Sequence, residues 1–177
     1  MEQIIANFRP IEIQKPYQCA ALAASFISSP YSTPMITADE IYSRRKNKRQ
    51  PGMPLPEALD ILMSEYCIKG YYTITTLADL VKEVLEHPCV ITLPMYDRNR
   101  YQFWRSPIHD SLPLQEVPYT IKHAAVIIHT TATHFLLRNS YKNADEDPED
   151  PLSGHVLFPH SHYRSALEAN GVIYYDH

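Results

Sequence analysis

The chain has little glycine, no long apolar run and no start typical of a secreted protein. Only 4 of its 177 residues are Gly, whereas 15 are Pro, so its loops are numerous without being flexible in the way of glycine-rich linkers. No apolar stretch approaches the roughly 20 residues of a membrane span. The first ten residues lack a basic start followed by an apolar stretch. We therefore expect no membrane partner and no secretion signal.

Cysteine and net positive charge are also scarce. Three Cys form an odd set without framework spacing, which favours a reduced intracellular protein over a disulfide scaffold. The formal net charge of −4 excludes general attraction to nucleic acid, so no nucleic-acid partner is expected. The one basic run, Arg44 to Arg49, is interpreted as a solvated helix end and not as a binding patch.

The pattern of apolar residues predicts an α+β protein, with helices first and mostly strands after them. Residues 1–16 are expected to be an extended arm. Capping and periodicity predict helices over residues 17–27, 37–42, 55–66 and 76–86. Strands are expected at 89–93, 123–129, 135–140, 154–158 and 171–175, with a short helix at 160–169.

The stretch from His123 to His129 and the one from Phe135 to Ser140 organise this expectation. Both carry continuous apolar residues, and a Thr-rich turn separates them. If the two strands pair antiparallel, His123 at the start of the first lies beside Asn139 at the end of the second. An Asn side chain that orients a His ring is half of a nucleophilic site.

Cys19 is the candidate for the other half. It follows Pro16 closely and opens an Ala-rich, apolar segment that predicts a buried helix. Backbone N–H groups and the helix dipole at such a start stabilise a thiolate. The alternative interpretation is a small residue of the core. Donors for an oxyanion would be the backbone N–H of Cys19 and the side chain of either Gln14 or Gln18.

These motifs together resemble the papain-like cysteine proteases, the cathepsin family. The chain carries Gln14-Lys-Pro-Tyr-Gln-Cys19, then His123-Ala-Ala-Val, then Arg-Asn139-Ser-Tyr141. In that family a Cys begins a buried helix after an oxyanion-hole Gln, a His opens a strand, and an Asn ends the next strand. The resemblance touches most of the chain at low identity.

The resemblance implies a single catalytic domain over residues 1–177. Its helical lobe would span roughly 17–88, and its sheet lobe roughly 89–177 together with the N-terminal arm. Cys19, His123 and Asn139 would form the catalytic triad, Gln14 or Gln18 would complete the oxyanion hole, and no cofactor would be needed. A peptide or protein would be the substrate, and the setting would be cytoplasmic or viral.

The chain also departs from the family pattern. Gln14 is five residues before Cys19, one fewer than usual, and Ala20 replaces the family's Trp. Tyr141 stands where a Trp usually covers the His–Asn hydrogen bond. Lys122 precedes His123, where many relatives carry an acid. We expect Lys122 and Tyr141 to border the cleft.

Three alternatives remain at this level. A catalytically inactive papain-like module could hold a peptide in the same cleft, and an amidase or acyltransferase could use the same triad. A metal site from His155, His160 and His162 with the acidic run 145–150 matches no zinc signature, so no metal is expected. The oligomeric state stays open.

Overall fold

The protein is described from a computed structural model, which places residues 15, 17–73, 76–95, 121–138, 155–162 and 171–174. Its α-helices are α2 (Cys19–Ser28), α3 (Ala38–Ser43), α4 (Leu55–Tyr66) and α5 (Leu77–Glu86). Its strands are β1 (Gly70–Thr73), β2 (Cys89–Met95), β3 (Ile121–Thr130), β4 (His134–Arg138), β5 (His155–Pro159) and β6 (Gly171–Tyr174). Short 3-10 turns are η1 (Ser29–Tyr31) and η5 (His160–His162).

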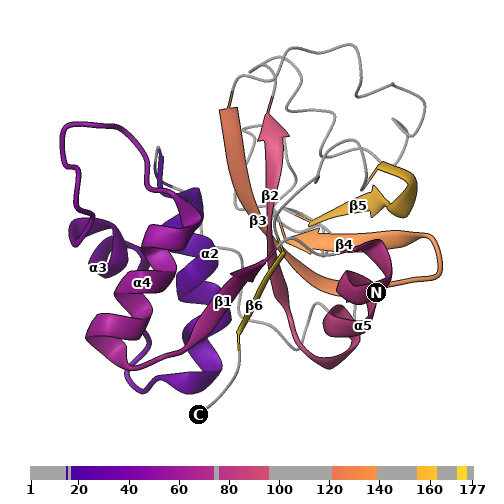
Figure 1. Ribbon diagram of the computed structural model, residues 1–177, viewed down its shortest axis with the longest axis horizontal. Helices are drawn as coiled ribbons and strands as arrows, with labels where there is room; N and C mark the ends of the chain where they lie inside the picture. Colours follow the sequence, from indigo (N-terminus) through magenta and orange to yellow (C-terminus); the bar gives the residue numbers. More distant parts are fainter. Residues whose placement is uncertain are drawn as a thin grey trace, which may run out of the picture.

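The strands form one antiparallel sheet of six, in the order β1-β6-β2-β3-β4-β5. Figure 1 shows α2, α3 and α4 gathered on one side of the sheet and α5 on another. Strand β3 lies between β2 and β4, with His123 opposite Leu93 and Val126 opposite Arg138. The expected antiparallel pairing of β3, which carries His123, with β4, which carries Phe135, is confirmed. The α+β class is confirmed as well.

Local sequence explains where the helices begin. Thr37 accepts a hydrogen bond from the Glu40 N–H and the Glu40 carboxylate accepts one from the Thr37 N–H, which is a complete capping box at the start of α3. Thr76 caps α5 by accepting from the Asp79 N–H. The predicted starts of these helices are therefore confirmed.

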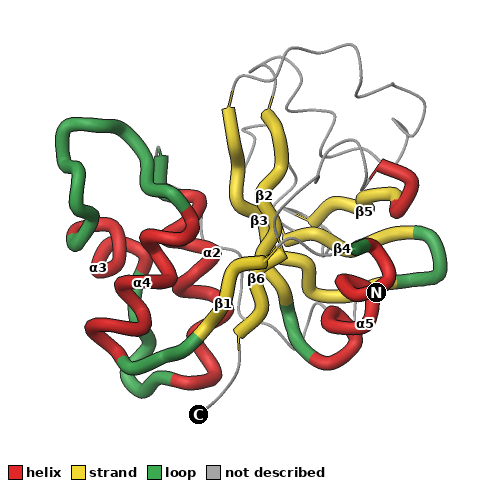
Figure 2. Tube along the Cα trace, viewed as in Figure 1, coloured by secondary structure: helices red, strands yellow, loops and turns green. Residues whose placement is uncertain are grey.

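Strand alternation divides the core into two clusters. One face of β3 carries Ala124, Val126 and Ile128, which pack with α2 and the other helices of that side. The opposite face carries Ala125 and Ile127, which pack with α5. The tube in Figure 2 shows the sheet running between these two groups of helices. Strand β3 thus belongs to both cores.

The structure moves the boundary between helical and sheet parts. Strand β1 pairs with β6, and no strand was predicted at residues 70–73. Helix α5 buries Leu80 and Val84 against the sheet and not among α2, α3 and α4. Both elements lie within residues 17–88, the range expected for the helical lobe. The arm at 1–14 and most of the predicted helix at 160–169 lie outside the described residues.

Candidate active site

Cys19 is the first residue of α2, two residues after the start at Tyr17 that the sequence predicts. The residues after it, from Ala20 to Ser28, are all buried, so the helix is enclosed by the core. Cys19 itself is only partly buried. Gln18 caps the helix through its backbone, with the Leu22 N–H donating to the Gln18 carbonyl at 2.9 Å. The thiol therefore lies where free backbone N–H groups of a helix start are available.

The Cys19 thiol meets His123 of β3. Burial alone would raise the pKa of this thiol. A hydrogen bond with the His123 ring, the charge of that ring, and backbone N–H groups of Ala124 and Ala20 oppose burial and together hold the pKa below its ordinary value. His123 is only 5% exposed. A thiol and an imidazole that stabilise each other in this way can act as a nucleophile and its base.

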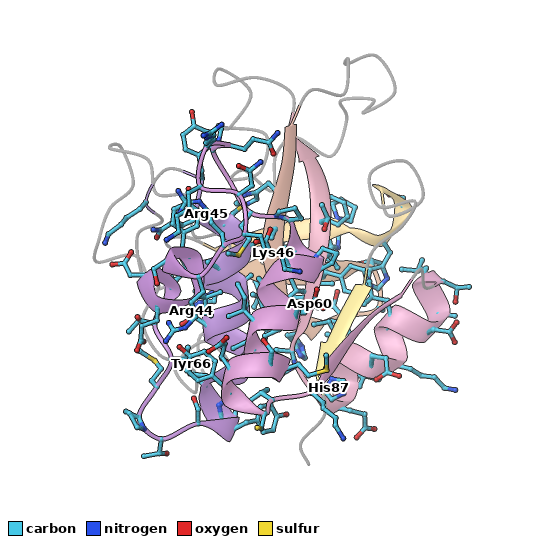
Figure 3. The ribbon with its side chains drawn as sticks, turned by 60° about the vertical axis from the view of Figure 1, so that its left-hand side comes forward. Arg44, Arg45, Lys46, Asp60, Tyr66 and His87 are labelled. Carbon is cyan, nitrogen blue, oxygen red and sulfur yellow. The ribbon has the colours of Figure 1, made fainter. Side chains whose placement is uncertain are left out.

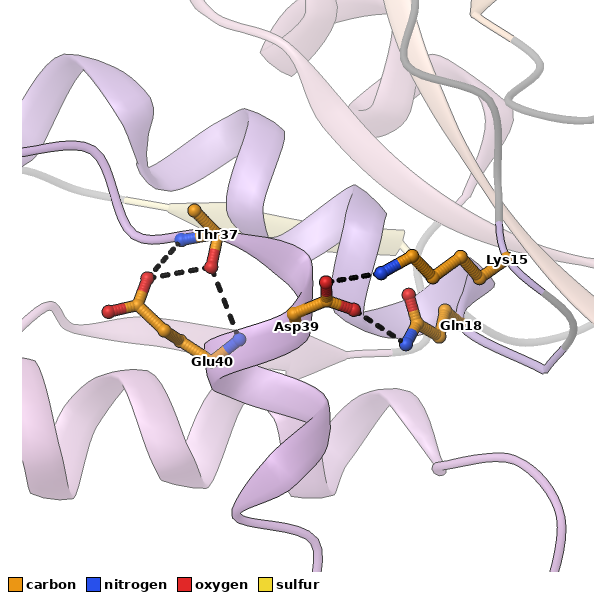
Figure 4. Close-up of polar contacts among 5 residues, drawn as sticks. All are labelled: Lys15, Gln18, Thr37, Asp39 and Glu40. Carbon is orange, nitrogen blue, oxygen red and sulfur yellow. Dashed lines mark hydrogen bonds and ion pairs between the residues drawn. The ribbon is translucent and has the colours of Figure 1, made fainter.

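The side chain of Gln18 is buried and turned toward α3. Its Nε2 donates to Asp39 Oδ1 at 3.0 Å, and Lys15 Nζ donates to the other oxygen of the same carboxylate. The close-up in Figure 4 shows both bonds converging on Asp39. One of the two Gln18 amide hydrogens is thus committed to Asp39, which leaves a single hydrogen for any other acceptor.

The remaining predicted site residues are not placed. Asn139, Gln14 and Tyr141 lie outside the described residues. The backbone of Lys122 pairs with Pro94 in the sheet, and its side chain is outside the description. The structure thus brings together Cys19 and His123, while the roles of Gln18 and of the other residues stay predictions.

Arg138, the last residue of β4, links the sheet to helix α2, which begins at Cys19. It is 7% exposed, and its guanidinium lies 4.4 Å from the centre of the Phe26 ring of α2. A guanidinium stacked on an aromatic face is held by charge–quadrupole attraction as well as by burial. Asn139 follows directly in the sequence, so this contact fixes the chain immediately before it.

The other two thiols lie in different surroundings. Cys89 begins β2 and is fully buried, and burial followed by the charge of Glu83 raises its pKa to about 12. Cys67 follows α4 in a left-handed conformation with φ 57° and is exposed. Neither faces His123 in the described structure, which sets Cys19 apart.

The basic run after α3 is paired with acids, as the labelled side chains in Figure 3 illustrate. Arg44 lies 4.0 Å from Glu65 and also donates to the Glu40 carbonyl at 2.9 Å. Lys46 lies 3.9 Å from Asp60 of α4. Two of the five cations of the run are thus paired with acids of α4.

The histidines near β5 show no metal arrangement. His160 lies 3.1 Å from Thr130 through its Nε2 and packs 4.3 Å from the Phe135 ring. Burial first, and then the neighbouring His134, lower the pKa of His160. Within the described segments no group of three or more His, Cys, Asp or Glu could hold a metal ion. The acidic run at 145–150 lies outside them.

The sequence did not reveal Asp39 or the stack of Arg138 on Phe26. Asp39 occupies the first turn of a capped helix, where an acid is already favoured by the helix dipole. Nothing local in the sequence indicates that its carboxylate reaches Gln18, which is 21 residues away. Only the packing of α3 against α2 makes this contact.

Sequence comparison and structure comparison give different results. No family model matches the sequence, and no curated protein matches it. Among solved structures, the Carica candamarcensis cysteine protease CMS1MS2 in complex with E-64 is 12% identical, with a TM-score of 0.66 over 98% of this chain and 95% of that one. Bromelain from Ananas comosus is 12% identical, with a TM-score of 0.65 over 98% and 96%.

A protease from a transporter is also similar. The double glycine motif protease of an AMS/PCAT transporter, solved with its leader peptide, is 13% identical with a TM-score of 0.59, over 93% of this chain and 89% of that one. The fold is therefore that of the papain-like and C39-like cysteine peptidases. None of the helices in the described part is long and apolar enough to cross a membrane.

Proposed function

We propose that this chain is a cysteine peptidase that hydrolyses peptide or isopeptide bonds. Cys19 is the nucleophile, His123 the base and then the acid, and Asn139 the residue that orients His123. The oxyanion is held by the backbone N–H of Cys19 with Gln14 or, alternatively, Gln18. The observation that carries the proposal is the Cys19–His123 pair at the start of a buried helix.

The chemistry follows from the pair. The Cys19 thiolate attacks the carbonyl carbon, and the carbonyl oxygen becomes an oxyanion facing the N–H donors. His123 gives its proton to the leaving amine, the C–N bond breaks, and a thioester remains. His123 then takes a proton from water, whose oxygen attacks the thioester and releases the acid and the thiol.

A peptide substrate is supported by the neighbours. The transporter protease was solved with a leader peptide. The Carica candamarcensis protein is a cysteine protease that was solved in complex with E-64. These likenesses concern the fold. They make a peptide the first substrate class to test on this chain, while the side-chain preference is left to experiment.

Thiol reactivity tests the proposal directly. We expect a small epoxide or iodoacetamide at mildly acidic pH to label Cys19 selectively, because an ordinary thiol with a pKa of about 8.5 is almost fully protonated there. Cys67 and Cys89 serve as controls within the same chain, mapped by peptide mass. Equal labelling of Cys19 and the exposed Cys67 would refute the pair. So would selective labelling of Cys19 that is unchanged in His123→Ala.

An inactive binding module is the second candidate, and it is motivated by Lys122 at a position where many papain-like relatives carry an acid. That candidate predicts peptide binding that is insensitive to Cys19→Ser, together with a Cys19 of ordinary reactivity. An amidase or acyltransferase would show the same reactive thiol and would be distinguished by the product formed with an added amine.

A further inference from the structure

The chain turns between Lys15 and Gln18, directly before the nucleophile. The Gln18 N–H donates to the Lys15 carbonyl at 3.2 Å. The third residue of this turn, Tyr17, has φ 65°, a left-handed conformation that residues other than Gly and Asn adopt at a cost. Turns with a positive φ at the third position prefer Gly there. This turn therefore needs support from outside its own sequence.

Asp39 supplies that support from α3. Its carboxylate accepts hydrogen bonds from Lys15 and Gln18, the first and last residues of the turn. We call these two bonds the Asp39 anchor. Because both ends of the turn are tied to one rigid group, the distance between them is fixed. Hydrogen bonds from Lys15 and then Gln18 lower the pKa of Asp39. The carboxylate is therefore charged at neutral pH.

The anchor is itself held firmly. The capping box of Thr37 and Glu40 fixes the first turn of α3 (Figure 4). Ser25 of α2 donates to the Ile36 carbonyl at 2.7 Å in the buried core, and Ile41 of α3 is fully buried. Asp39 is thus positioned relative to α2 by contacts that do not involve the turn.

Resting on the proposed function, we propose that Asp39 is a positioning residue for the oxyanion hole. It acts through the turn, which ends at the helix N-terminus that carries the Cys19 N–H. Gln14 directly precedes Lys15 in the sequence, and Gln18, the last residue of the turn, directly precedes Cys19, so the two candidate donors lie at the two ends of the anchored segment. The Cys19–His123 contact reaches β3 by another route and does not depend on the anchor.

Two reagents that both react with the Cys19 thiol distinguish the oxyanion hole from the thiolate. Acylation by p-nitrophenyl acetate forms a bond from sulfur to the acetyl carbon, passes through an oxyanion and releases p-nitrophenolate. Alkylation by iodoacetamide displaces iodide at carbon without an oxyanion. The ratio of the two rates, each corrected by the rate of Cys19→Ala, reports the oxyanion hole independently of the thiolate.

We expect Asp39→Ala to lower the ester rate about tenfold, a fraction of the 10²–10³-fold loss seen when an oxyanion donor is removed. The iodoacetamide rate should stay within about twofold, since the thiolate is intact. Asp60→Ala is the matched control, because Asp60 also pairs with a lysine, Lys46, and is 61% exposed against 57% for Asp39. That control should change neither rate.

Rescue sharpens the test. Tyr17→Gly removes the steric cost of the left-handed residue, so the double variant with Asp39→Ala should recover at least about half of the ester rate. If Asp39→Ala does not fold, Asp39→Asn decides. It keeps an oxygen for Gln18 but loses the charge that holds Lys15, and a fall of about threefold in the ester rate is expected.

Two results would overturn the inference: an Asp39 variant that matches Asp60→Ala in both rates, or one in which both rates fall together. Failure of the proposed function looks different. In that case the wild-type Cys19 itself shows no preferential alkylation at mildly acidic pH, whatever residue is at position 39.

Discussion

Cys19 and Cys89 are two thiols that each have a histidine close by, yet their chemistry differs. Cys19 begins a helix, and the hydrogen bond and charge of His123 outweigh burial and lower its pKa. Cys89 begins a strand, and its Sγ lies 4.0 Å from His87 Nδ1. Burial, together with the charge of Glu83, raises the pKa of Cys89 to about 12. A nearby histidine is therefore not enough to activate a thiol.

The difference lies in what else the histidine and the thiol face. The Nε2 of His87 lies 3.5 Å from the Glu83 carboxylate. The histidine beside Cys89 therefore comes with a negative charge. Cys19 has backbone N–H groups of Ala20 and Ala124 directed at its sulfur. Donors and positive charge stabilise a thiolate, whereas an acid in an apolar core opposes one.

The largest contrast is expected from removing each sulfur. Cys19→Ala should reduce peptide hydrolysis by about 10⁴-fold or more, because nucleophile and base act as a unit. Cys89→Ala should keep turnover and cost about 1 kcal/mol of stability through a small core cavity. Turnover with a fluorogenic peptide and urea unfolding measure the two effects. Hydrolysis that survives in Cys19→Ala would remove Cys19 from the mechanism.

Ionisation of Cys89 should destabilise the fold at high pH. Its pKa is raised to about 12 in the folded state, so between the ordinary thiol pKa of about 8.5 and 12 the folded state binds more protons than the unfolded state, and stability falls as pH rises. The difference between a pKa of about 8.5 and one of about 12 corresponds to about 5 kcal/mol.

Urea unfolding from pH 8 to 12 measures this loss as the difference between the wild type and Cys89→Ala, which share all other titrating groups. The ionisation of Cys19 changes the stability with pH in the opposite direction. Its lowered pKa contributes stability above the ordinary thiol pKa, and that contribution disappears as pH falls through the folded-state pKa. Parallel pH profiles of the wild type and Cys89→Ala would contradict the assignment for Cys89.

The two histidines should differ in their effect on labelling. His123→Ala is expected to slow iodoacetamide labelling of Cys19 at pH 5.5 by about 100-fold, because the thiolate loses its hydrogen bond and its compensating charge. His87→Ala should leave Cys19 unchanged and Cys89 unlabelled, since burial dominates there. Quantified peptide mass spectra report all three thiols at once. An equal effect of both variants on Cys19 would argue for general destabilisation instead of pairing.

The smallest contrast concerns the two threonine caps. Thr37→Ala and Thr76→Ala each remove a side-chain acceptor at a helix start, and each should cost about 1 kcal/mol of stability. Only Thr37 supports α3, which carries Asp39, so only Thr37→Ala should lower the ester rate of Cys19, by about twofold to threefold. If Thr76→Ala lowers that rate equally, the effect comes from stability and not from the anchor.

Helix starts were the most predictable part of the fold. Thr37 with Glu40, and Thr76 with Asp79, are signals contained within four residues, and the structure has both helices where these signals predict them. For α2 the sequence predicted a start at Tyr17, whereas the helix begins at Cys19, because Gln18 is the N-cap and Tyr17 has a left-handed φ of 65°. Local hydrogen bonding and propensity are encoded by neighbours in sequence, which is why they could be recognised.

Long-range partners were harder to predict. Strand β1 has only four residues and pairs with β6, about a hundred residues away, so its own sequence gave little sign of a strand. Helix α5 has the amphipathic pattern of any surface helix, and that pattern does not say which layer it covers. Its packing against the sheet was therefore not foreseen.

The sequence by itself determined the α+β class, a helix with Cys19 in its first turn and the antiparallel pairing of the strands that carry His123 and Phe135, because each follows from propensity, caps and apolar pattern. The tertiary structure decided which thiol is activated. Cys19 and Cys89 both have a histidine in reach, and only the three-dimensional distribution of N–H donors, charge and burial gives their pKa values opposite directions. It also decided that Asp39 reaches the turn before Cys19, since that contact depends on how α3 packs on α2.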